Sequence, residues 1–294
     1  MRNTTAIFLL VCLTLNSNTA AAQVIRFTNQ PARTNDVASQ TIECDLDADR
    51  TIRQHNQVVD TSKQQLRRQQ VRTVTVLETT KGKATRAKIS YVQSTTKVKV
   101  QNNAVAEAKQ PIEGKTYLVA RAGEQLIVTD EIGQPISDEE SKILLPQLNS
   151  FGKPNPLAQF LNGKQISVGD SIDVPDEVAA ELLGLTGNAG KTDQLTLRLT
   201  AIKADGGVDC ALFETLLRSH SDESSISLLM KGELMIDPNT CRTRSIQMHG
   251  PVAISERRGP AQGRFTVSTN GSLKVAVRNE HRPATMAARQ KTRR

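Results

Sequence analysis

The sequence predicts an α+β fold in which a curved, half-barrel-like antiparallel sheet forms one domain and a short helical insertion covers one face. Long segments on both sides of the middle of the chain alternate apolar and polar residues, which is typical of half-buried strands. Turn sequences rich in Gly, Asn and Asp separate successive segments, which favours antiparallel hairpins. Helical spacing and helix caps are concentrated in residues 137–184, so this insertion has to cover the sheet.

The N-terminus has the features of a secretory signal peptide. Arg2 supplies the positive charge, Ala6 to Leu15 form the apolar core, and "TAAAQ" offers a small-residue cleavage site after Ala22. The apolar run is far shorter than the ~20 residues of a membrane-spanning helix. We therefore expect an exported protein, periplasmic or extracellular and not membrane-spanning.

The first strands follow a short leader. Residues 23–39 show little pattern, and we expect them to be loosely ordered. In "TIECDLDAD" the apolar and acidic residues alternate strictly, which predicts a half-buried strand. One face carries Ile42, Cys44, Leu46 and Ala48, and the other carries Glu43, Asp45, Asp47 and Asp49.

Two hairpins follow this strand. "RTVTVLETT" and "AKISYVQSTTKVKV" flank "KGKA", which predicts a long hairpin with Gly82 in its turn. "TYLVAR" and "EQLIVTDE" form a shorter pair around "AGE".

The helical insertion contains three predicted helices. Ser137 and Glu140 have the spacing of a capping box, and Pro146 should end or kink the helix that they begin. Asn155, Pro156 and Gly163 mark the start and end of a second, short helix. The third runs from Pro175 to Gly184.

Strands return after the insertion. Leu195, Leu197, Leu199 and Ala201 alternate with polar residues, "VDCALFETLLR" runs back, and a third strand starts near Ile226. "GRFTVSTNGSLKVAVRN" predicts a final hairpin whose loop, residues 269–271, pairs Val267 with Leu273 and Phe265 with Val275. The single domain then covers residues 40–281, and residues 282–294 form a basic tail without apolar periodicity, which predicts disorder.

Three cysteines remain in the mature chain. Strand spacing places Cys210 opposite Gly232 and leaves Cys241 beyond the ~7 Å reach of a disulfide. Cys44 and Cys210 could pair, or both could be buried free thiols, which we favour. Cys241 follows "DPNT" at a position that needs a positive φ, so we expect an exposed, mildly strained free thiol at a hairpin tip, without catalytic function.

Charge is distributed unevenly along the chain. Residues 50–109 carry 13 Lys and Arg against 3 Asp and Glu, whereas residues 110–189 carry 5 against 12. Nucleic-acid binding sites usually interleave aromatic residues for stacking, and Tyr91 is the one aromatic residue in the basic ribbon 50–109, so we exclude nucleic acid as a partner. Anionic polymers or lipid headgroups of the cell envelope suit an exported basic protein better, and a plain soluble face is the simplest interpretation.

Motifs for catalysis and metal binding do not occur in the sequence. Asp45, Asp47 and Asp49 do not fit a calcium loop, because Arg50 stands where the loop needs glycine. The four histidines are scattered, and nucleophile, phosphate-loop and C-x-x-C motifs do not occur. We therefore expect no enzyme, no metal and no cofactor.

Part of the second half of the chain resembles a known type of protein. The segments "GKQISVGDSIDVPDEVAAELLG", "LTLRLTAIKADGGVDCALFE" and "GELMIDPNTCRTRSIQMHG" look like those of a family of uncharacterised secreted bacterial proteins. The architecture is similar to that of lipoprotein carriers, which implies a curved sheet with helices over its concave face and brings no catalytic residues. This chain has Ile172 where an aromatic residue is common and Cys241 where a turn glycine is common.

The predicted function is an exported binding or carrier module for a hydrophobic or lipidic ligand. The ligand would occupy a cleft between the sheet and the helices, although complete packing of the same side chains as ordinary core is the simpler alternative. The alternative function is electrostatic association with an anionic envelope component through the basic ribbon 50–109 and the tail. The predicted cleft residues are Leu144, Leu148, Phe160, Leu161, Leu199, Leu212, Leu228 and Met230.

Export gives a first testable prediction. Cleavage after Ala22 would leave a mature chain that begins at Gln23, because signal peptidases recognise the small residues before the cleavage site. N-terminal sequencing of the protein purified from its own cells should begin at Gln23, and a mature chain that retains Met1 would contradict the prediction.

Overall fold

The computed structural model describes residues 23–55, 57–101, 103–104, 107–183, 191–221, 226–259 and 264–282. The expected signal peptide and the tail beyond residue 282 lie outside these ranges. None of the helices in the described ranges is long and apolar enough to cross a membrane.

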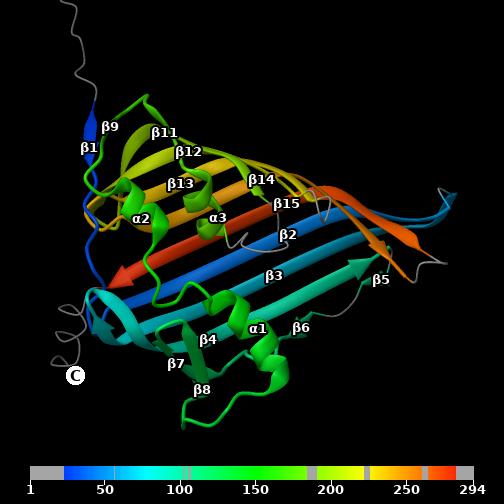
Figure 1. Ribbon diagram of the computed structural model, residues 1–294, viewed down its shortest axis with the longest axis horizontal. Helices are drawn as coiled ribbons and strands as arrows, with labels where there is room; N and C mark the ends of the chain where they lie inside the picture. Colours follow the sequence, from blue (N-terminus) through cyan, green and yellow to red (C-terminus); the bar gives the residue numbers. More distant parts are fainter. Residues whose placement is uncertain are drawn as a thin grey trace, which may run out of the picture.

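The described residues form one large sheet, a small two-stranded sheet and three helices (Figure 1). The small sheet pairs β1 (Val24–Arg26) with β9 (Gln165–Ser167). The helices are α1 (Asp138–Leu148), α2 (Pro156–Leu161) and α3 (Asp176–Leu183). The strands of the large sheet are β2 (Val37–Gln54), β3 (Gln57–Thr80), β4 (Lys83–Val100), β5 (Asn103–Ala104), β6 (Ala108–Lys109), β7 (Thr116–Ala122), β8 (Gln125–Asp130), β10 (Ser171–Asp173), β11 (Lys191–Asp205), β12 (Val208–Ser221), β13 (Ile226–Asp237), β14 (Arg242–Arg258) and β15 (Phe265–Arg282).

The large sheet is antiparallel throughout and open. Its strand order is β10-β11-β12-β13-β14-β15-β2-β3-β4-β7-β8, with the short β5 and β6 also paired to β4. The edge strands β10 and β8 are not paired with each other, so the sheet does not close into a barrel. The predicted antiparallel sheet is confirmed, but the α+β label overstates the helices, because strands make up most of the fold.

Local turn and cap chemistry accounts for several of the predicted elements. Lys81 and Gly82 both have a positive φ, at 52° and 77°, as a two-residue hairpin turn between β3 and β4 requires. Ser137 and Glu140 form the capping box of α1, and Asn155 caps α2 with Pro156 as the first helical residue. The helix α1 continues past Pro146 to Leu148, so this proline lies in its last turn and does not end the helix there.

The helices cover the same face of the sheet at two separate places. The helices α2 and α3, together with β1 and β9, pack over β11, β12 and β13, and Phe27, Leu161 and Phe213 are fully buried in this first cluster. The helix α1 packs over β4 and β7 in a second cluster, where Leu144 contacts the region of Tyr91 and Tyr117. Figure 1 shows both helical covers on the near side of the sheet, with β15, β2 and β3 passing between them.

The predicted final hairpin does not form. Residues 265–282 are one continuous strand, and Gly271 lies in its middle, opposite Val252 of β14 and Ala48 of β2. A Cβ at Gly271 would lie 2.3 Å from the carbonyl oxygen of Asp47, so this glycine allows a close approach of β2 and does not make a turn. All eighteen residues of β15 pair with β2, and residues 265–278 also pair with β14, which satisfies more backbone groups than a hairpin with free edges would.

The register of β12 and β13 also differs from the expectation. Gly232 pairs with Thr215 and with Met248, so Cys210 lies near Asp237, at the end of β13, and not opposite Gly232.

Residues 23–39, expected to be a loosely ordered leader, contain β1 and the fully buried Phe27, and β2 already begins at Val37. Apolar contacts of the leader with α2 and β12 hold it in place.

A buried carboxylate joins α1 to the sheet. Glu140 accepts hydrogen bonds from the hydroxyl of Tyr117 and the Nζ of Lys115, both at 2.8 Å, and from the Ser137 backbone in the capping box. Burial works against ionisation, but these hydrogen bonds prevail and lower the pKa of Glu140 to about 2. The ionised Glu140 is therefore part of the native state at neutral pH.

The pKa of Glu140 predicts acid sensitivity of this cover. Because the folded pKa lies below the ordinary value of 4.5, ionised Glu140 stabilises the fold above that value, and this stabilisation is lost as the pH falls toward 2. We expect Glu140→Gln to reduce the free energy of unfolding at pH 7 by about 1–3 kcal/mol. The free energy of unfolding of this variant should also depend less on pH between 4.5 and 2 than that of the native protein. Urea unfolding at several pH values measures both effects. The exposed neighbour Glu139, replaced by Gln, serves as the control, and equal behaviour of the two variants would contradict the assignment.

Candidate ligand-binding trough

Most residues of the predicted cleft are packed as core. Leu144 and Leu148 belong to the cluster under α1, whereas Leu161, Leu199 and Met230 belong to the cluster under α2 and α3, so the structure does not bring the two groups together. Two more predicted residues, Phe160 and Leu228, are partly buried at the margin of the cluster under α2 and α3. Leu212 follows the alternation of β12 and faces the opposite side from its neighbour Phe213.

A half-buried apolar surface lies between the two helical covers. Cross-strand pairs place its residues on one face: Met248 pairs with Val275 and Val275 with Cys44, while Leu273 pairs with Leu46 and Leu46 with Leu66. Several of them pack against the margin of the α2 and α3 cluster, which identifies this face as the one with the helices. We call the surface the apolar trough; it comprises Ile42, Cys44, Leu46, Leu66, Ile246, Met248, Leu273, Val275 and Val277, all half-buried.

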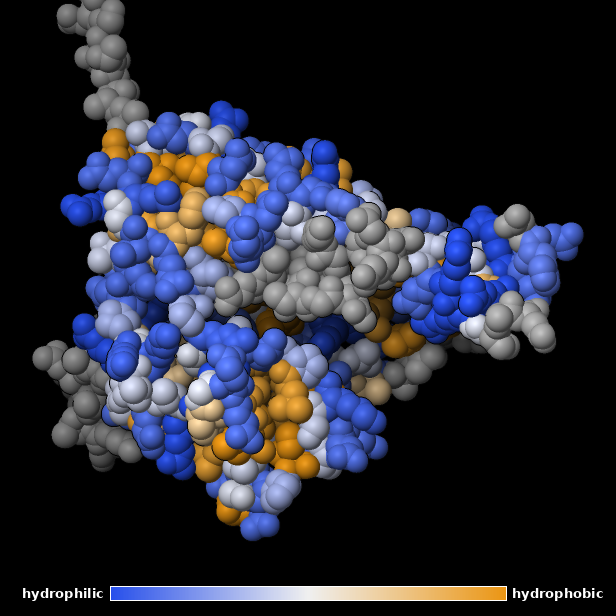
Figure 2. Space-filling view, in the orientation of Figure 1, coloured by the Kyte–Doolittle hydropathy of each residue, from blue (hydrophilic) through white to orange (hydrophobic). Residues whose placement is uncertain are grey.

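The space-filling view agrees with this arrangement. Figure 2 shows the molecule hollowed between the cover formed by α2 and α3 and the cover formed by α1, with apolar side chains visible inside the hollow. Monomeric proteins seldom leave a continuous apolar strip open to solvent without a use for it. The apolar trough is therefore the candidate binding surface.

A ladder of polar side chains crosses the same face at one end of the trough. Asn279 donates to the carbonyl oxygen of Thr243 (3.0 Å), Gln40 donates to Asn279 (2.9 Å), and Arg72 donates through Nε to Gln40 (2.7 Å). The guanidinium of Arg72 also lies 3.4 Å from the hydroxyl of Tyr91. These side chains hydrogen-bond to one another, and they lie between the apolar trough and the end of the sheet.

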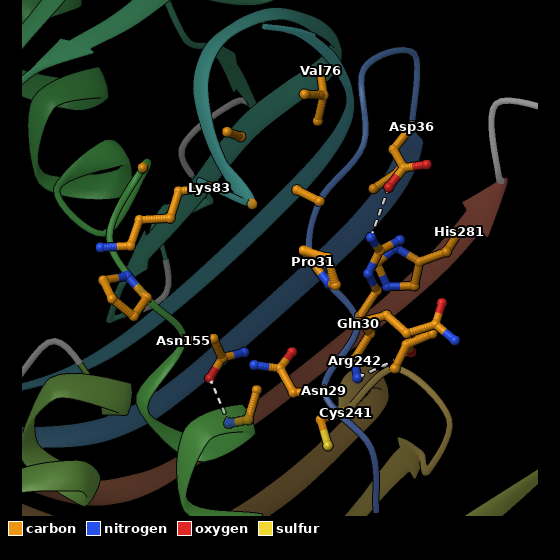
Figure 3. Close-up of a pocket in the computed structure, with 18 of the residues that line it drawn as sticks. Asn29, Gln30, Pro31, Asp36, Val76, Lys83, Asn155, Cys241, Arg242 and His281 are labelled. Atoms are coloured by element: carbon orange, nitrogen blue, oxygen red, sulfur yellow. Dashed lines mark hydrogen bonds and ion pairs between the residues drawn. The ribbon is translucent and has the colours of Figure 1, made fainter. Parts of the chain in front are cut away.

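Beyond the ladder lies a pocket of about 500 Å³. Its walls are the segment from Asn29 to Ala32, the turn at Lys81–Gly82, the start of α2 and the turn that ends in Arg242 (Figure 3). Arg242 forms an ion pair of 2.7 Å with Asp36 across the pocket wall. Burial, followed by the nearby charge of Arg242, lowers the pKa of His281, so this imidazole is neutral at pH 7.

Cys241 lies in the wall of this pocket and is not exposed as predicted. Its positive φ of 52° is confirmed, but only 2% of the residue is accessible. The N-terminal segment covers the turn, because the Thr28 amide donates to the Pro238 carbonyl oxygen (2.7 Å) and Phe27 packs in the same cluster. Burial raises the pKa of Cys241 to about 11, which makes the thiol unreactive at neutral pH. Cys44, Cys210 and Cys241 are all free thiols in the structure.

The opposite face of the sheet is charged, with both signs interleaved. Asp45 lies between Lys274 and Arg67 in the register and forms an ion pair of 2.8 Å with Arg67. Asp47 accepts a hydrogen bond from Gln65 (3.1 Å). The acids that could have held calcium therefore lie among basic and amide partners, and no metal-ligand group of three or more occurs within the described residues.

Comparisons with known proteins yield structural likenesses only. No family model and no curated protein matches the sequence. Lipovitellin, described in a structure of its lipid–protein interactions, is similar over 85% of this chain and 26% of its own, with 9% identity and a TM-score of 0.42. The outer membrane protein OprG of Pseudomonas aeruginosa covers 86% of this chain and 100% of its own at 9% identity and a TM-score of 0.18. These scores are too low for the likeness to carry an argument, and this chain spans about a quarter of the lipovitellin chain.

Sequence alternation could identify part of the trough but not its position. The pattern in "TIECDLDAD" places Ile42, Cys44 and Leu46 on one face, as observed. The trough was missed because most of its other residues come from β14 and β15, and the predicted hairpin separated β15 from β2.

The accessibility of the thiols tests whether the trough is open. Cys44 is half-buried on the trough floor, whereas Cys210 and Cys241 are buried. Burial raises the pKa of Cys44, but the charge of Arg68 acts against this rise. We expect a small maleimide to label Cys44 at least tenfold faster than the other two in the native protein, as read by mass spectrometry of peptides after a short pulse. Equal labelling of all three after denaturation is the control, and slow native labelling of Cys44 would mean that the trough is covered.

Proposed function

We propose that the protein is an exported, non-enzymatic binding module that holds a hydrophobic or lipidic ligand in the apolar trough. The observation that carries this proposal is the continuous half-buried apolar strip across β14, β15, β2 and β3. Ligand sites are concave and mostly apolar with a few polar groups. Figure 2 shows a hollow with apolar and polar side chains inside it.

The chemistry of the trough favours binding over catalysis. Its one nucleophile is the thiol of Cys44, whose pKa is raised by burial, and a protonated thiol is a poor nucleophile. The remaining floor residues are apolar, and the groups of the polar ladder at one end hydrogen-bond to one another. Hydrophobic contact area is therefore what this surface offers to a partner.

Electrostatic association through the basic ribbon 50–109 has less support. Arg67 of this ribbon is already paired with Asp45, and Arg86 with Glu78 at 3.0 Å. Each such ion pair reduces the positive field that the ribbon offers to an anionic polymer. The basic tail lies outside the described residues.

A pair of adjacent substitutions in β2 tests the proposed function. Leu46 faces the trough and Asp47 faces the opposite side, so Leu46→Ser should impair ligand binding and Asp47→Ser should not. The probe is N-phenyl-1-naphthylamine, whose fluorescence rises in apolar sites. We expect saturable binding by the native protein and a roughly tenfold weaker affinity for Leu46→Ser, since 1.4 kcal/mol of lost apolar contact corresponds to tenfold.

Two measurements make this test decisive. Circular dichroism and urea unfolding should show that both variants fold cooperatively. Absence of saturable binding by the folded native protein, together with no co-purified lipid in native mass spectrometry, would remove the proposed function.

A further inference from the structure

A charged side chain that has no partner in the described part of the chain lies on the same face as the trough residues. Arg68 of β3 pairs in the register with Cys44 on one side and Thr96 on the other, and it is half-buried. Its charge acts on the thiol of Cys44, so the guanidinium lies close to the trough floor. No hydrogen bond or ion pair of its side chain to another described residue is found.

The neighbouring arginine shows what the usual arrangement looks like. Arg67 precedes Arg68 in β3 and faces the opposite side, where it is 63% exposed and paired with Asp45. Water and the carboxylate satisfy Arg67. Arg68 is less exposed to water than Arg67 and has no carboxylate beside it. Burying a charge beside Leu46 and Leu66 costs more free energy than burying an apolar side chain there.

A second unsatisfied group lies directly opposite Arg68. The Oγ1 of Thr96 is buried and has no hydrogen-bond partner. Directly opposed residues of an antiparallel pair have Cβ atoms about 4.5–5.5 Å apart, so the side chains of Thr96 and Arg68 are neighbours on this face of the sheet. Buried polar groups without partners are rare and call for an explanation.

We infer that the trough takes a single-chain amphiphile with an anionic head group, a carboxylate or a phosphate, and that Arg68 and Thr96 hold this head. The inference rests on the proposed function. A guanidinium binds either head through two parallel N–H···O bonds, and Thr96 can donate its hydroxyl to the same group. The chain of the ligand would extend from β3 over the apolar floor toward β14, three strand spacings or about 14 Å away.

The experiment compares a fluorescent fatty acid, which carries a negative charge, with its uncharged ester. The probes are cis-parinaric acid, ionised at pH 8, and its uncharged methyl ester. We expect the native protein to bind the acid at least tenfold more tightly than the ester, which is about 1.4 kcal/mol. Arg68→Met should lower the affinity for the acid to about that for the ester and so remove this preference, whereas the matched control Arg67→Met should behave as the native protein.

The outcomes separate this inference from the proposed function. Equal binding of acid and ester by the native protein, or an unchanged preference in a folded Arg68→Met variant, overturns the head-group assignment and leaves the trough as a binding site. Failure of both probes to bind removes the proposed function itself. Competition by palmitate and by hexadecyl phosphate distinguishes the two heads; displacement by either supports the inference, and displacement by neither overturns it.

Discussion

The ladder between β15 and β2 is the interaction on which the rest of the structure depends. It joins the last described strand of the chain to the first strand of the large sheet along all eighteen residues of β15. The strands β2 to β8 and the strands β10 to β15 would otherwise be two smaller sheets, each with an open edge. Pairing these edges satisfies two rows of backbone groups at once and turns the two halves into a single curved surface.

The apolar trough exists because this joint lies under neither helical cover. The helix α1 packs over the N-terminal half of the sheet, and α2 and α3 pack over the C-terminal half, so the helical segment spans the joint without filling it. The side chains at the joint, such as Cys44 opposite Val275 and Leu46 opposite Leu273, are therefore apolar but only half-buried. A well-packed core would have closed this space, and leaving it open costs hydrophobic stabilisation unless a ligand fills it.

The polar groups along this face have two different characters. Gln40, Arg72 and Asn279 satisfy one another in a ladder that the protein completes by itself. Arg68 of β3 and Thr96 of β4, on the same face of the sheet, have no side-chain partners among the described residues. Since buried polar groups are almost always satisfied, this contrast is what distinguishes a structural network from a candidate site for an external anion.

The sequence by itself determined the elements whose causes are local. Alternation defined the strands, Gly82 defined the long hairpin, and Ser137 with Glu140 defined the start of α1, because each depends on neighbours within a few residues. The positive φ of Cys241 followed from its turn in the same way. Only the tertiary structure decided that Gly271 lies inside a strand, that the N-terminal segment buries Cys241, and that β15 lies beside β2. These features depend on pairing and burial between segments far apart in the chain, whose free energy can exceed the local preference of an Asn-Gly turn and is absent from any short stretch of sequence.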